Sequence, residues 1–196
     1  MFTLKITKRP PTAAKIVKQI RFGVAKGLTE TAKEGQKASI GAIKGSFTTR
    51  GTWYLPSNRY GIRIKAAKPT DLSAEVRTNA DWLIPHEEGK DKRAKDGRVA
   101  VPTDQVRRNK RLIIPRGQRP KGLGAKVFEM QTKRGKVLAQ RLKRGPRKGL
   151  VILYGLESRV RIERQSTFFD PIKKVVSRRL GKNIANGIRH ALATAK

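Results

Sequence analysis

Positive charge is concentrated in one stretch of this sequence. Residues 105–150 contain sixteen lysines and arginines but a single acidic residue, Glu129. These like charges repel one another, and burying them unpaired in a core would be costly. We therefore expect a loop-rich basic segment over about residues 87–149, with its charged side chains at the surface or against an anionic partner.

The excess of positive charge extends over the whole chain. Its 196 residues include 47 lysines and arginines against 14 acidic residues, which gives a net charge of +33. The phosphate backbone of a nucleic acid is the first candidate for a polyanion that offsets such a charge. A surface charged only for solubility is the alternative, but solubility does not require so large an excess. Nucleic-acid binding is therefore the leading hypothesis.

The composition of the basic stretch indicates how a nucleic acid would be bound. Phe128 is its only aromatic residue, so it lacks a platform on which the bases of a single strand could stack. No zinc-finger, helix-turn-helix or RNA-recognition signature is present, which argues against base readout. We expect sequence-independent contact with the phosphates of double-stranded DNA or folded RNA. The candidate contact residues are Arg107, Arg108, Lys110, Arg111, Arg116, Arg119, Lys121, Lys133, Arg134, Arg141, Lys143, Arg144, Arg147 and Lys148.

The sequence contains no arrangement typical of an enzyme or a cofactor site. The lack of cysteine excludes disulfides, cysteine zinc sites and thiol catalysis. Gly117 and Gly122 have the spacing of a phosphate-binding loop, but Leu123 stands where that motif needs lysine. His86 precedes two glutamates, and adjacent carboxylates in a loop usually point into solvent. We expect no catalytic residue, no cofactor and no metal. Since no apolar run reaches about 18 residues, we also expect no membrane span.

Hydrophobic spacing predicts two long helices near the ends of the chain. After an arm over residues 1–12, apolar residues recur at helical spacing over about 13–43. Glycines in this first helix weaken it but permit close approach of another backbone. A second apolar stripe runs over 172–192, with Asp170 placed as its cap.

Alternating apolar and polar residues predict short strands between the two helices. The predicted strand segments are 60–64, 72–76, 99–101, 127–130, 137–139, 150–154 and 160–162, the last two forming a pair. The predicted fold class is α+β, with long N- and C-terminal helices flanking a curved antiparallel β-sheet, sandwich- or barrel-like, and with basic loops. Residues 13–196 are expected to form a single domain after the arm.

The order of these elements and several short sequence words resemble a known family. The words follow an alanine-rich first helix and are Gly61–Arg77, Ala125–Met130, Thr132–Val137, Leu153–Glu157 and Ser166–Pro171. They resemble the minor tail protein Z family of tailed phages, the tail completion or neck proteins, over about residues 13–195. His86–Gly89 also resembles a glutamate- and glycine-containing turn that follows the second strand in the broader neck family.

The resemblance implies a structural protein of the phage neck. Such proteins form a ring, usually a hexamer, between the head-closure or connector protein and the tail terminator or tail tube protein. Double-stranded DNA lies in the channel of the ring. The chain would then be assembled in the host cytoplasm and located in the virion. Nonspecific phosphate contact would allow DNA to slide through such a ring.

Two other classes of function stay open at this point. Composition alone favours a ribosomal or other RNA-binding structural protein, because small basic chains with extended loops bind ribosomal RNA in this way. A basic nucleoid-like protein that binds DNA on its own is less favoured. Stoichiometry separates the first two classes, since the neck protein forms a ring whereas a ribosomal protein is present as a single copy in a ribonucleoprotein.

Overall fold

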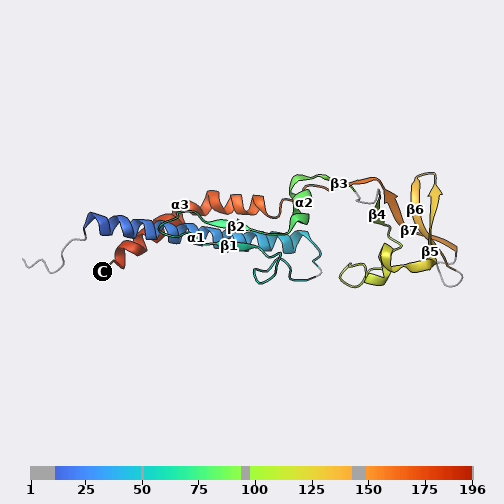
Figure 1. The fold of residues 1–196 in the computed structure, drawn as a ribbon, viewed down its shortest axis with the longest axis horizontal. Coiled ribbons are helices and arrows are strands. Elements are labelled where there is room, and N and C mark those ends of the chain that lie inside the picture. Colours follow the sequence, from blue (N-terminus) through green and yellow to red (C-terminus); the bar gives the residue numbers. More distant parts are fainter. Residues whose placement is uncertain (1–11, 50, 94–97, 143–148, 196) are drawn as a thin grey trace, which may run out of the picture. The chain divides into compact units, whose positions relative to one another are not determined.

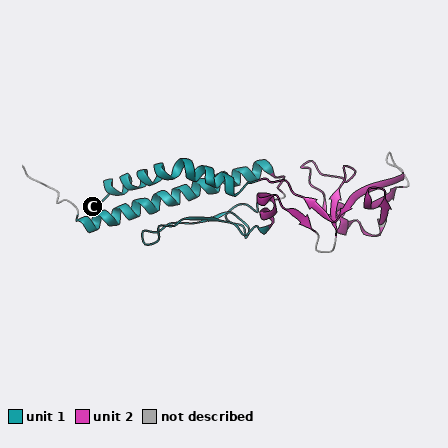
Figure 2. Cartoon of the chain, turned by 90° about the horizontal axis from the view of Figure 1, so that it is seen from above, with its two compact units in different colours: residues 1–46, 52–81, 166–196 teal, residues 47–51, 82–165 magenta. Residues whose placement is uncertain are grey.

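The structure is a computed structural model that describes residues 12–49, 51–93, 98–142 and 149–195. It is α+β, with 44% helix and 24% strand, and its N- and C-terminal helices precede and follow antiparallel strands, as predicted. The largest sheet is open, so a barrel-like closure stays a prediction. Two compact units are present (Figure 2), one of residues 1–46, 52–81 and 166–196 and the other of 47–51 and 82–165. Whether residues 13–196 fold as a single domain stays a prediction.

Two antiparallel helices form the first unit and lie side by side in Figure 1. Helix α1, Ala13–Ser46, begins at the predicted residue and ends three residues later than expected. Helix α3, Phe169–Ala193, begins one residue before Asp170. Asp170 therefore lies in the first turn rather than at the cap, and its backbone N–H donates to the Ser166 hydroxyl at 3.2 Å.

Glycines allow the two helix backbones to touch. A Cβ atom added at Gly23 would lie 2.5 Å from the Cα of Ile188, and one added at Gly187 would collide with the carbonyl oxygen of Gly23. Gly27 makes a similarly close approach to Ile184. The helical glycines thus stabilise the pair by permitting backbone contact, although each one lowers the intrinsic helix propensity.

Polar side chains fix the helix pair across the same contact. The Thr31 hydroxyl donates to the carbonyl of Gly27 and accepts a bond of 3.1 Å from the Asn183 amide. Arg179 and Glu34 form an ion pair at 3.6 Å, one on each helix. Because hydrogen bonds need defined geometry, these polar contacts help to fix the position of one helix against the other.

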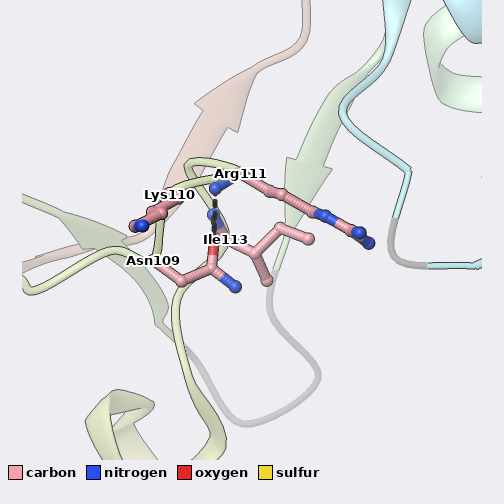
Figure 3. Close-up of a pocket in the computed structure, with 4 residues that line it drawn as sticks. All are labelled: Asn109, Lys110, Arg111 and Ile113. Carbon is pink, nitrogen blue, oxygen red and sulfur yellow. Dashed lines mark hydrogen bonds between the residues drawn. The ribbon is translucent and has the colours of Figure 1, made fainter.

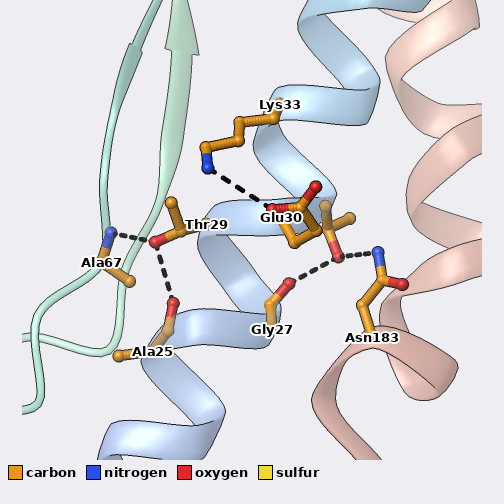
Figure 4. A network of polar contacts seen from close by, with 8 residues as sticks. Ala25, Gly27, Thr29, Glu30, Lys33, Ala67 and Asn183 are labelled. Carbon is orange, nitrogen blue, oxygen red and sulfur yellow. Dashed lines mark hydrogen bonds and ion pairs between the residues drawn. The ribbon is translucent and has the colours of Figure 1, made fainter. Parts of the chain in front are cut away.

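A β-hairpin packs along α1 in the same unit. The Thr29 hydroxyl accepts the backbone N–H of Ala67 at 3.1 Å (Figure 4), and the Gln36 amide donates to the carbonyl of Ile62 at 2.6 Å. The hairpin confirms the strand pair predicted around residues 68–71. Its two antiparallel strands are β1, Arg63–Lys65, and β2, Glu75–Arg77.

An open four-stranded antiparallel sheet forms the centre of the second unit. Its strand order is β4-β7-β6-β5, with bounds Val99–Pro102, Gly149–Glu157, Gly135–Leu142 and Val127–Thr132. Opposite the step from Leu138 to Ala139, β7 has one extra residue, Leu153. This bulge interrupts the alternation of the strand, so Leu153 and its neighbour Tyr154 are both buried.

The last predicted strand pair is wrong. Strand β8, Arg159–Arg161, pairs with β3, Asp91–Arg93, and not with β7. A single residue, Ser158, separates β7 from β8, which is too short for a hairpin turn, and the chain continues into another two-stranded sheet.

Short helices complete the fold. Helix α2, Ile84–Glu88, ends at Gly89, whose φ of 68° is the left-handed conformation common at helix ends. Residues 86–89 were predicted as part of a turn, and the structure extends this turn into a helix. The 3-10 helices are Asp81–Leu83, Arg116–Gln118, Pro120–Gly122 and Gly124–Lys126.

Candidate nucleic-acid interface

Most of the described candidate contact residues lie on one loop, residues 103–126, which we call the basic loop. It connects β4 to β5 and carries Arg107, Arg108, Lys110, Arg111, Arg116, Arg119 and Lys121. Lys133 and Arg134 form the turn between β5 and β6, and Arg141 lies near the end of β6. The other four candidates, Lys143, Arg144, Arg147 and Lys148, lie outside the described residues.

The basic loop is packed onto the sheet by its few apolar residues. Val106 is only 3% exposed and belongs to a core cluster with Val151, Leu153 and Tyr154 of β7. Two further apolar residues of the loop, Ile114 and Leu123, pack against the same cluster. Burial of these side chains orders the loop, so its cations project from a fixed backbone.

Tyr154 holds the middle of the loop through a partly buried hydrogen bond. Its hydroxyl donates to the carbonyl of Gln118 at 2.6 Å. Burial raises the pKa of Tyr154 above the ordinary tyrosine value, and this effect outweighs the opposite influence of Arg108 and Arg119. The phenol therefore keeps its proton, and the donor, throughout the neutral pH range.

A closed turn forms the tip of the loop between Asn109 and Ile113 (Figure 3). The Asn109 carboxamide oxygen accepts the backbone N–H groups of Arg111 at 3.0 Å and Ile113 at 2.9 Å. Two backbone bonds of 2.9 Å also close it, from Asn109 N to Ile113 O and from Leu112 N to Asn109 O. An open hollow of about 480 Å³ lies beside the turn and is lined by Asn109, Lys110, Arg111 and Ile113.

Where the structure describes them, the cations of the interface face solvent without carboxylate partners. Nine of the ten described candidates are exposed, and Arg119 is half-buried with its Nε donating to the carbonyl of Ile114. Within the described parts of the chain, none of the ten forms an ion pair with a carboxylate. Uncompensated like charges on an ordered loop are the arrangement that an anionic ligand stabilises.

Sequence reasoning missed a second group of cations, on the ribbon of β3 and β8. In this ribbon Arg93 lies directly opposite Arg159, and Lys92 and Arg161 are also exposed. Among the described residues, the carboxylate that pairs with this group is Asp91, at 3.7 Å from Arg159. Like charges that face each other across a strand pair are destabilising, so the ribbon also favours a nearby anion. Residues 91–93 had been predicted as loop, which hid the pairing.

The roles of Tyr154 and Asn109 were also missed. An asparagine next to basic residues is a weak sign of a turn, whereas nothing near Tyr154 in the sequence indicates its bond to Gln118, 36 residues away.

His86 makes packing and backbone contacts with neighbouring segments of the chain. The imidazole packs edge-on against Phe47, with ring centroids 5.0 Å apart, and the His86 carbonyl accepts the N–H of Gln165. Glu87 is buried, at 6% exposed. In the portion of the chain that the structure describes, no three His, Cys, Asp or Glu residues cluster as a metal site would require.

Two broader observations concern the chain as a whole. In its described residues, no helix has a stretch both long and apolar enough to cross a lipid bilayer. Comparisons with models of protein families, with curated proteins and with solved structures find no match to this chain. The likeness to phage neck proteins therefore rests on the order of the predicted elements and the short sequence words, and it stays a hypothesis.

Proposed function

We propose that the basic loop binds double-stranded DNA through its phosphates and without reading its sequence. The observation that carries this proposal is the combination of order and charge in the loop. Val106 and Tyr154 fix its backbone, while its cations are almost all exposed and have no described acidic partner. A fixed array of cations releases condensed counterions from DNA when it meets the backbone, at little cost in loop entropy.

The proposal extends to the role of the whole chain, as a non-catalytic structural protein of the phage neck. It would form a ring, expected to be hexameric, between the head-closure or connector protein and the tail terminator or tail tube protein. This part rests on the sequence resemblance. Exposed apolar side chains near the start of α1 offer a surface for packing between subunits, and they include Ile16, Val17, Ile20 and Phe22.

Salt dependence of binding tests the phosphate contact. Affinity for two unrelated duplexes, measured between low and moderate salt, should fall steeply and equally for both. If the seven candidate contact residues of the loop all engage, the logarithm of the affinity should fall against the logarithm of salt with a slope of about −6. A flat salt response, or a strong preference for one sequence, would contradict the proposal.

A matched pair of variants assigns the binding to the loop. Three changes in the loop, Arg107→Gln, Arg108→Gln and Lys110→Gln, should weaken binding and make the slope shallower by about one for each cation removed. Three changes on α3, Lys173→Gln, Lys174→Gln and Arg178→Gln, remove the same charge from exposed positions and should have a smaller effect. Equal effects of the two triple variants would show that net charge alone governs binding. Tighter binding of folded RNA than of duplex DNA would favour a ribosomal or other RNA-binding protein.

A further inference from the structure

Leu112 has an unusual backbone conformation at the tip of the basic loop. Its φ of 58° lies in the left-handed region, which leucine rarely adopts. Its side chain is 67% exposed, more than any other large hydrophobic side chain in the described residues. An apolar side chain held in solvent by an unfavourable backbone indicates a contact that the isolated chain leaves unmade.

The exposure of Leu112 does not come from a loose segment. Asn109 accepts hydrogen bonds from the backbone on both sides of Leu112, and its own carbonyl accepts the N–H of Leu112 at 2.9 Å. Behind the tip, Ile114 packs against the core cluster of the sheet. The turn is thus fixed at its base, and Leu112 projects from it.

Cations flank this apolar tip. Lys110 and Arg111 are both exposed and extend from the turn in opposite directions (Figure 3). No acidic residue is present in the sequence from 105 to 128. A surface that receives Leu112 must therefore offer an apolar slot with negative charge on either side.

We infer that Leu112 is a wedge that enters the minor groove of double-stranded DNA and inserts between two neighbouring base pairs. Lys110 and Arg111 then contact the phosphates on the two edges of the groove, which is about 6 Å wide. Leucine is one of the apolar side chains that unstack base steps from this groove and bend the duplex. The inference rests on the proposed binding of duplex DNA and adds to it a point of insertion.

A membrane surface would also attract the flanking cations, but it fits the turn less well. Segments that lie in a membrane interface bury a broad apolar face. Leu112 is the only exposed large hydrophobic residue that the structure describes in the basic loop, since Ile113 and Ile114 are half-buried and Val106 is buried. A single apolar side chain between cations matches a base step better than a lipid layer.

Substitution of Leu112 can remove the wedge and keep the turn. Asparagine and glycine adopt a positive φ more readily than leucine, so Leu112→Asn and Leu112→Gly are expected to retain the turn. Leu72→Asn, at a leucine that is 40% exposed in the first unit, is the matched control. The probe is a duplex with 2-aminopurine at its centre, which reports unstacking, and a pair of fluorophores at its ends, which reports bending.

The wild-type protein and Leu72→Asn should raise the 2-aminopurine fluorescence and shorten the distance between the ends of the duplex. The two Leu112 variants should bind about tenfold more weakly, give neither signal at saturation, and keep the salt slope because no cation is removed. Asn109→Ala should lose the signals as well, since Arg111 and Ile113 lose their acceptor.

Several outcomes would overturn the wedge. The wedge would be contradicted if the unstacking and bending signals persisted in Leu112→Asn, or if bound wild-type protein gave neither signal. Both results would leave the proposed phosphate contact intact. Failure of the wild-type protein to bind any duplex would instead overturn the proposed function as well. Binding to vesicles of anionic lipid that depends on Leu112, without binding to DNA, would assign the tip to a membrane.

Discussion

Gly187 and Gly181 lie on the same helix, but only Gly181 has room for a side chain. A Cβ on Gly187 would collide with the carbonyl oxygen of Gly23, whereas one on Gly181 would meet nothing within 4 Å. Gly187→Ala should therefore lower the free energy of unfolding by about 2 kcal/mol or more through overpacking. Gly181→Ala should raise it by about 0.5–1 kcal/mol through helix propensity. Urea unfolding of both variants measures the two effects, and equal effects would contradict the backbone contact.

At the scale of the residue, the sequence indicated that glycines of the first helix could approach another backbone, but not which of them do. Gly23, Gly27 and Gly41 all interrupt the first helix, and close approach was expected of its glycines as a group. Only the first two meet the backbone of α3, while nothing lies within 4 Å of a Cβ at Gly41. The spacing of four residues between Gly23 and Gly27 places both on one helix face, but the sequence does not say which face is covered.

At the scale of the element, the basic loop depends on Tyr154. Tyr154→Phe removes the hydrogen bond to Gln118 and should lower the free energy of unfolding by about 1 kcal/mol near neutral pH, because the partly buried carbonyl loses its donor. Urea unfolding measures this difference, and faster hydrogen exchange over residues 105–126 would show that the loop has loosened. Tyr60→Phe, at a tyrosine that is 36% exposed, is the control.

The difference in stability between the wild type and Tyr154→Phe should decrease as the pH rises. Burial raises the pKa of Tyr154 in the folded state above the ordinary value of 10.0. Above that pH the unfolded phenol loses its proton while the folded one retains it, so the wild-type protein loses stability as the pH rises toward the folded pKa. Tyr154→Phe lacks this group. Its stability should therefore approach that of the wild type above about pH 10, and a constant difference between the two would contradict the assignment.

Elements with a local signal could be predicted from the sequence, and those with a nonlocal signal could not. The stripe over 172–192 and the alternation around 68–71 repeat over a few residues, so they indicated a helix and a hairpin. The pairing of β3 with β8 joins segments far apart in the chain and sets Arg93 against Arg159, which cross-strand preferences disfavour. For the candidate site, the composition predicted the cations of the basic loop. It did not predict the burial of Val106 or the hydrogen bond from Tyr154 to Gln118, which order the loop.

At the scale of the whole molecule, the positive charge is carried by both compact units. Exposed lysines and arginines line α3 in the first unit, and others occupy the basic loop and the β3–β8 ribbon in the second. A net charge of +33 opposes compact folding and self-association in the absence of a polyanion. We therefore expect the protein to assemble most readily where nucleic acid is present.

Under the proposed neck role, loss of the protein should block a late step of virion assembly. The sequence contains no phosphate-binding loop to drive DNA packaging, so packaging is expected to proceed without it. A deletion strain should therefore yield filled heads and complete tails that fail to join, or joined particles that do not infect. Electron microscopy and infectivity assays measure this. Empty proheads would point to an earlier role, and impaired ribosome assembly would favour the RNA-binding alternative.

The contact of Gly187 with Gly23 and Gly27 has a mechanical consequence. Sliding α3 along α1 by one turn would replace Gly187 at this contact with Ala191 or Asn183, and each of these carries a Cβ where only hydrogen fits. The two helices therefore pack in a single register. A force along the helix axes is resisted by collision between backbone atoms rather than by flexible side chains. The two helices should therefore transmit a force along their axes as one rigid pair. Under a large enough force, we expect α3 to separate from α1 rather than to slide to a neighbouring register.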